Sequence, residues 1–212
     1  MSENLNHRYP REEERLNIIT HGLGLLASLI AFPFLLQKAF NYGAIWSKVS
    51  LILYGLSLII LYVASTFYHA STKPVVRRRF NIFDHAAIYV LIAGSYSPFC
   101  LIALNSKLGW YMFLFVWLFA LVGVVLKLFF TGKFDKVSTL MYLLMGWQVV
   151  FFIKPLVKSL SDEGVTFLVA GGVFYTIGAI FYSIGKIKYN HAIFHVFVLL
   201  GSLSHFLAIY YL

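Results

Sequence analysis

Seven long apolar runs divide the chain, and they constrain its fold more than any other feature. They lie near residues 17–39, 45–69, 82–104, 109–130, 137–158, 164–184 and 190–211. Each is close to the length of about 20 residues that a helix needs to cross the hydrocarbon core of a bilayer. The connections are short and rich in turn-forming residues. We therefore expect an all-α fold, a bundle of seven transmembrane helices.

The composition agrees with a membrane protein whose partners are lipids. Charged residues make up 12% of the chain, about half of the roughly 25% that is usual in soluble domains. The net charge of +9 does not indicate nucleic-acid binding, because the basic residues lie in short connections without interleaved aromatic residues. Arg77, Arg78 and Arg79 form the densest basic cluster, which favours contact with anionic headgroups. No soluble protein partner is indicated.

The basic residues also predict how the bundle is oriented. When the connections are assigned alternately to two sides, twelve Lys and Arg residues fall on the side of the N-terminus and five on the other. The positive-inside rule then places the N-terminus in the cytoplasm and the C-terminus outside. The first 16 residues do not resemble a signal peptide. We expect a cytoplasmic tail over 1–16 and a single transmembrane domain over 17–212.

Five of the seven histidines lie at the cytoplasmic ends of spans, together with the one carboxylate at a span mouth. An ionisable group inside a membrane is a functional candidate by default, because burying it unpaired costs free energy. The alternative for Asp84 is an N-cap, since Asp stabilises helix starts. Scattered structural histidines would not be expected to sort to one side. The histidines in question are His21, His69, His85, His191 and His195.

His191 and His195 are four residues apart, so their side chains share one face of a helix. This spacing allows two imidazoles to bind one metal ion, although capping or lining a water-filled cavity would also explain them. His69 would supply a third nitrogen. Three protein ligands with an open position are typical of catalytic zinc.

Three further residues could support such a site. Ser65 lies one turn before His69 on the same helix face, although a serine in a membrane helix usually bonds its own backbone. His85 is next to Asp84 and therefore about 100° round the helix, which makes it a poorer ligand for the same ion. His21 has no spacing partner, and we interpret it as a second-shell residue or a hydrogen-bonding group in a cavity.

The motifs STFYH (Ser65, His69), FDH (Asp84) and HAIFH (His191, His195) resemble the signature of the progestin and adipoQ receptor family. The contexts NIITHGLG and ASTFYHAS are most similar to its bacterial branch, the hemolysin III proteins. The resemblance implies a multi-pass protein of the bacterial inner (plasma) membrane with a cytoplasmic N-terminus. It also implies Zn²⁺ held by the three histidines, with Asp84 near the water that zinc activates and Ser65 hydrogen-bonding nearby. The wider superfamily includes alkaline ceramidases.

The leading hypothesis is zinc-dependent, ceramidase-like hydrolysis of a lipid amide or ester, or a role in membrane lipid homeostasis. Asp84 would act as the acid–base group and Ser65 would support the reacting atoms, while the three arginines would hold an anionic headgroup. One alternative is a non-catalytic sensor or receptor of membrane state with structural zinc. Another is a pore-forming, cytolytic protein, which the lack of a polar helix face does not favour.

Overall fold

A computed structural model of the chain describes residues 9–132 and 134–212, and within these ranges the structure is helical without strands. Seven segments of this part are long and apolar enough to cross a membrane, which confirms the predicted fold class. In chain order the elements are α1 (Arg11–Asn41), α2 (Ile45–Ala70), α3 (Pro74–Pro98), the π-helix η1 (Phe99–Ala103), α4 (Lys107–Phe130), α5 (Asp135–Gly146), the 3₁₀-helix η2 (Trp147–Phe152), α6 (Ile153–Lys158), α7 (Asp162–Ser183) and α8 (Asn190–Tyr210).

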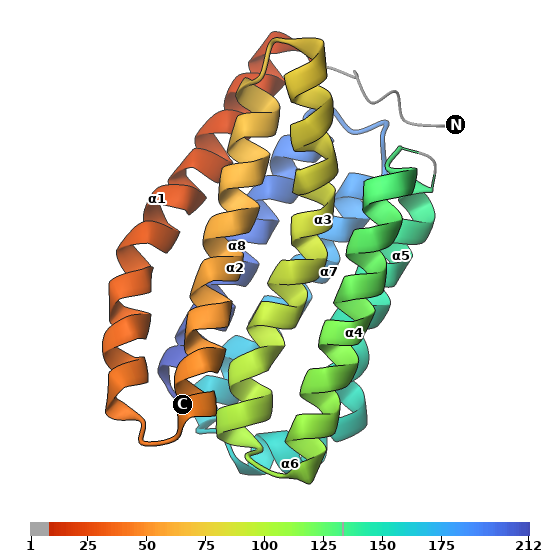
Figure 1. The fold of residues 1–212 in the computed structure, drawn as a ribbon. Helices are drawn as coiled ribbons and strands as arrows, with labels where there is room; N and C mark the ends of the chain where they lie inside the picture. Colours follow the sequence, from red (N-terminus) through yellow and green to blue (C-terminus); the bar gives the residue numbers. More distant parts are fainter. Residues whose placement is uncertain (1–8, 133) are drawn as a thin grey trace.

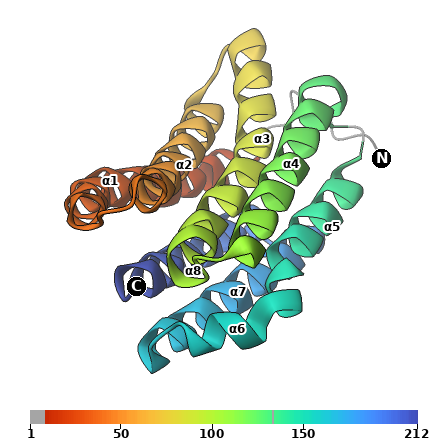
Figure 2. The ribbon, with the colours of Figure 1, turned by 60° about the horizontal axis from the view of Figure 1, so that its bottom comes forward.

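The helices form a ring in which each span packs on the next one along the chain (Figures 1 and 2). The last helix, α8, packs on both α7 and α1 and so closes the ring. The start of α1, the end of α2 and the starts of α3 and α8 lie at the same end of the bundle, at the top of Figure 1. This is the end that the basic residues predict to be cytoplasmic, and we call it the cytoplasmic end.

Two helices begin earlier than the apolar runs indicate. α1 begins at Arg11, so residues 11–16 of the predicted tail are helical, and residues 1–8 of that tail lie outside the described residues. Acidic residues in the first turn stabilise this start through the helix dipole. α3 begins at Pro74, which suits a first helical position because proline has no N–H to satisfy there. The three adjacent arginines are therefore helical residues rather than loop residues.

The fifth span is broken in its middle. It consists of α5, the 3₁₀-helix η2 and α6, and such a break leaves backbone groups that must be satisfied inside a membrane. The Tyr96 hydroxyl donates to the Gly146 carbonyl at 2.5 Å and accepts from the Val149 N–H at 2.9 Å. The Trp147 indole donates to the Thr176 hydroxyl on α7 at 3.1 Å. These contacts hold the broken span against α3 and α7.

The helix α1 turns its polar and small residues toward the bundle and its large apolar residues outward. Asn17, His21, Gly24 and Ser28 are buried, whereas many leucines and isoleucines of the same helix are exposed. This pattern is the reverse of a soluble amphipathic helix and suits a surface that faces lipid. It brings several polar side chains of α1 into the interior near the cytoplasmic end.

Candidate metal centre

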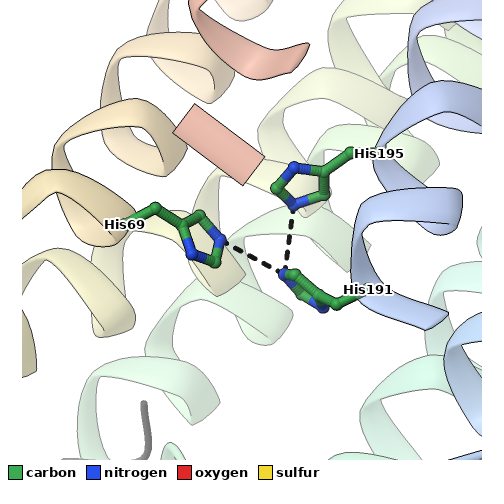
Figure 3. Close-up of side chains that lie close together, drawn as sticks. All are labelled: His69, His191 and His195. Atoms are coloured by element: carbon green, nitrogen blue, oxygen red, sulfur yellow. Dashed lines mark hydrogen bonds between the residues drawn. The ribbon is translucent and has the colours of Figure 1, made fainter. Parts of the chain in front are cut away.

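Three buried imidazoles converge at the cytoplasmic end of the bundle (Figure 3). His69 comes from the last turn of α2, and His191 and His195 from the first two turns of α8. The His191 Nε2 lies 3.2 Å from the His69 Nε2 and 3.1 Å from the His195 Nε2. One nitrogen from each of the three rings lies within 4.8 Å of the other two.

These separations fit one tetrahedral metal ion. Zinc binds histidine nitrogen at about 2.0–2.1 Å, so two nitrogens of a tetrahedral site lie about 3.3 Å apart. The two Nε2 separations around His191 are close to this value. Neutral imidazoles whose Nε2 atoms carry no proton would also direct their lone pairs at one another and repel. A cation bound between them would remove this repulsion. Among the described residues, this is the group of histidines and carboxylates whose geometry could hold a metal.

A carboxylate from α1 contacts the other nitrogen of His69. Glu14 Oε2 lies 2.7 Å from the His69 Nδ1, and the amide nitrogen of Asn17 lies 3.4 Å from the same atom. The second oxygen of Glu14 accepts a hydrogen bond from the Arg77 guanidinium at 2.5 Å. Arg77 also donates to the Tyr68 carbonyl at 3.0 Å. A chain of contacts thus runs from α3 through α1 to the His69 ring.

The two histidines of α8 are packed by residues from the N-terminal part of the chain. The Thr20 hydroxyl lies 3.3 Å from the His195 Nδ1, and the His21 ring stacks on the His195 ring with centroids 3.4 Å apart. The Tyr9 ring stacks on His191 with centroids 4.6 Å apart. These contacts restrict the orientation of both imidazoles. His21 therefore lies beside the triad, in contact with the His195 ring.

The other predicted site residues lie around the triad at different depths. Ser65 is fully buried, and its hydroxyl has no hydrogen-bond partner among the described residues. Asp84 is buried and faces the central cavity. His85 is half-buried, and its Nδ1 donates to the Asn81 carbonyl at 2.8 Å. Its ring is not part of the metal-binding group, in agreement with its position round the helix.

A cavity of about 340 Å³ extends from the triad toward the outer half of the bundle. At its cytoplasmic end it is lined by His191, His195 and Asp84, and at its other end by His205. Between them the lining is mostly apolar, and most of it comes from α3, the broken fifth span, α7 and α8, with His21, Leu61 and Lys127 contributed by other helices. His69 and Ser65 are not part of this lining. The cavity can hold an apolar chain with one end at the triad.

The expectation that all three arginines bind headgroups is wrong for Arg77. Its side chain is 2% exposed, because it pairs with Glu14 and stacks over the Tyr68 ring at 4.4 Å from the centroid. Arg78 and Arg79 are exposed, as a contact with lipid requires. The helical start of α3 explains the difference, since consecutive residues on a helix point in different directions.

Sequence reasoning missed Glu14, Asn17 and Thr20, because residues up to 16 were assigned to the tail and only His21 was singled out in the rest of α1. A signal was present. Glu14, Asn17, His21, Gly24 and Ser28 are spaced by three and four residues, so they share one helix face. A polar stripe of this kind in a membrane helix points to the bundle interior.

A seven-helix membrane protein with three buried imidazoles converging near one end is the class that this fold and site define. The comparison with known protein families identifies the family within this class. The chain belongs to the haemolysin-III related family, whose model matches residues 9–206, and this confirms the resemblance inferred from the motifs.

Relatives include both bacterial and animal proteins. Hemolysin-3 of Bacillus cereus is 43% identical over 93% of this chain and 90% of its own length. The Hemolysin-3 homolog of Bacillus subtilis is 45% identical over 93% of both chains. The human monocyte to macrophage differentiation factor is 28% identical over 97% of this chain and 90% of its own. The similarity therefore spans nearly the whole molecule.

Proposed function

We propose that the protein is a zinc-dependent hydrolase that cleaves an amide or ester bond of a membrane lipid. The observation that supports this most is that two triad histidines, His191 and His195, line the inner end of a largely apolar cavity together with Asp84. A structural metal site needs no substrate-sized space beside it. A lipid hydrolase needs a metal, an acid–base group and room for an acyl chain in one place.

Each residue then has a chemical role. Zn²⁺ bound by His69, His191 and His195 would polarise the scissile carbonyl and lower the pKa of water to about 7. The carboxylate of Asp84 would accept a proton from the attacking water and pass it to the nitrogen or oxygen of the leaving group. The Ser65 hydroxyl, which has no partner among the described residues, would donate a hydrogen bond to the developing oxyanion.

The products are a fatty acid and an amine or alcohol, so the reaction needs only water and the lipid. The acyl chain would lie in the cavity. The exposed guanidinium groups of Arg78 and Arg79 would bind an anionic headgroup at the membrane surface. We further propose that the protein resides in the inner (plasma) membrane, where both its substrate and a role in lipid homeostasis would be found.

The test is lipid turnover by the purified, full-length protein in vesicles. Vesicles containing ceramide or an ester phospholipid are incubated with zinc-loaded protein, and released fatty acid is measured by mass spectrometry. We expect release that falls at least about 100-fold in Asp84→Asn and is lost in His191→Ala, while Thr166→Val at the other end of the bundle behaves like the parent. Turnover that is identical in the parent and His191→Ala would refute the proposal.

A second candidate is a non-catalytic sensor in which the metal is structural. It is favoured by the fact that the triad joins α2 to α8, elements far apart in the sequence. In that case zinc would raise the stability of the protein without release of fatty acid from any lipid tested.

A pore is less well supported, because the lining of the cavity is mostly apolar. Efflux of a trapped dye from vesicles that contain the protein would indicate a pore.

A further inference from the structure

We propose that α1 selects which nitrogen of two triad histidines is available to a metal, through Glu14 for His69 and through Thr20 for His195. The inference rests on the proposed metal centre and adds two positioning residues to it. It also gives a role to α1, the first span of the chain, which supplies none of the three triad side chains.

A neutral imidazole carries one proton on either Nδ1 or Nε2, and only the nitrogen without the proton can bind a metal. Glu14 Oε2 lies 2.7 Å from the His69 Nδ1. A carboxylate accepts hydrogen bonds, so this contact holds the proton on Nδ1 and leaves the Nε2 lone pair free. The His69 Nε2 is the atom that lies 3.2 Å from the His191 Nε2.

The carboxylate of Glu14 is itself held in place. Its other oxygen accepts hydrogen bonds from the Arg77 guanidinium at 2.5 Å and from the Tyr9 backbone N–H at 3.1 Å. Each oxygen therefore has its own partners, and the carboxylate cannot turn away from His69 without losing them. Because Arg77 is buried, this arrangement is fixed by the packing of α3 against the end of α2.

Thr20 acts on His195 in the same sense. Its hydroxyl hydrogen is directed to the backbone of its own helix, since the oxygen lies 2.8 Å from the Leu16 carbonyl and 3.1 Å from the Asn17 carbonyl. The Thr20 oxygen then accepts from the His195 Nδ1, 3.3 Å away. The His195 Nε2 is left free, and it lies 3.1 Å from the His191 Nε2.

Two separate contacts from α1 thus have the same effect. Each leaves the Nε2 of a triad histidine without a proton, and both of these Nε2 atoms lie near the His191 Nε2. Hydrogen bonds to the ring nitrogen that does not face the metal typically change metal affinity by about 10–100-fold. The metal-binding arrangement is then already present before the ion binds. Loss of either contact would allow the proton to move to Nε2 in part of the molecules, and the metal would have to compete with it.

The experiment measures Zn²⁺ affinity of the full-length protein in detergent by competition with a chromophoric chelator. Thr20→Val removes the oxygen and keeps the shape, and Thr20→Ser restores the oxygen. Thr166→Val is the matched control, since Thr166 makes the same bond to its own helix without facing the triad. Glu14→Ala is compared with Glu12→Ala, an exposed neighbour that contacts the Tyr189 hydroxyl instead. The absorption bands of bound Co²⁺ report the ligand geometry, and circular dichroism without metal reports folding.

We expect Thr20→Val to lower Zn²⁺ affinity about tenfold and Glu14→Ala about 10–100-fold, with altered Co²⁺ bands. Thr20→Ser should return to within about threefold of the parent, and both controls should remain within about twofold. Parental affinity in Thr20→Val and Glu14→Ala, or equal losses in the controls, would overturn the inference while leaving the metal centre intact. A parent protein that binds no Zn²⁺ would overturn the metal centre as well. If Glu14→Ala does not fold, the Thr20 and Thr166 variants decide the question by themselves.

Discussion

Replacing Arg77 with alanine should destabilise the protein far more than the same change at Arg78. The Arg77 guanidinium lies 2.5 Å from the Glu14 carboxylate and is almost fully buried. At an effective dielectric constant of about 20, two unit charges at this distance attract by about 7 kcal/mol, and desolvation offsets part of this. Removing one partner of a buried pair costs about 3–5 kcal/mol. Arg78 is exposed, so its loss should cost at most about 0.5 kcal/mol.

The free energy of unfolding can be measured in mixed micelles with a denaturing detergent, by following tryptophan fluorescence and circular dichroism. A double-mutant cycle with Arg77→Ala and Glu14→Ala isolates the interaction between these two residues. The double variant should lose less free energy of unfolding than the two single variants lose in sum, because it leaves no uncompensated buried charge. Equal free energies of unfolding in Arg77→Ala and Arg78→Ala, within about 0.5 kcal/mol, would refute the argument that Arg77 is an internal structural residue.

Two further predictions use the same measurement. Gly24→Ala should lower the free energy of unfolding by about 1–3 kcal/mol, because the new Cβ would lie 2.4 Å from a ring atom of Tyr62. Gly22→Ala should not lower it, because a Cβ at that position would have nothing within 4 Å. Equal losses in the two variants would contradict the packing of α1. Tyr96→Phe should cost about 1–3 kcal/mol by leaving backbone groups of the broken fifth span unpaired, whereas Tyr111→Phe on the exposed surface of α4 should be neutral. A neutral Tyr96→Phe would show that the break is held by other contacts.

The seven spans and the triad could be predicted because their signals are local. A hydrophobic run long enough to cross a bilayer leaves few alternatives to a helix, and all seven appear in the structure near their expected positions. The spacing of His191 and His195 on one helix face requires no knowledge of the fold. Assigning alternate helix ends to two sides was enough to bring His69 to the same end as this pair.

The remaining features depend on packing that the sequence shows only indirectly. The break in the fifth span lies in an apolar run, and the Tyr96 hydroxyl that satisfies it comes from another helix. Glu14 and Arg77 lie at span ends, where charged residues usually face water or headgroups. Only the three-dimensional arrangement reveals that these two pair with each other in the interior.

The origin of the triad in α2 and α8 has a consequence for how the protein is made. His69 and His191 are separated by 122 positions, and four spans lie between α2 and α8, the two helices that carry the triad. Until α8 has been inserted, a nascent chain can therefore offer one triad histidine at most. An ion that needs all three histidines could bind only after α8 has joined the bundle, so a bound metal would mark molecules in which α8 is correctly inserted.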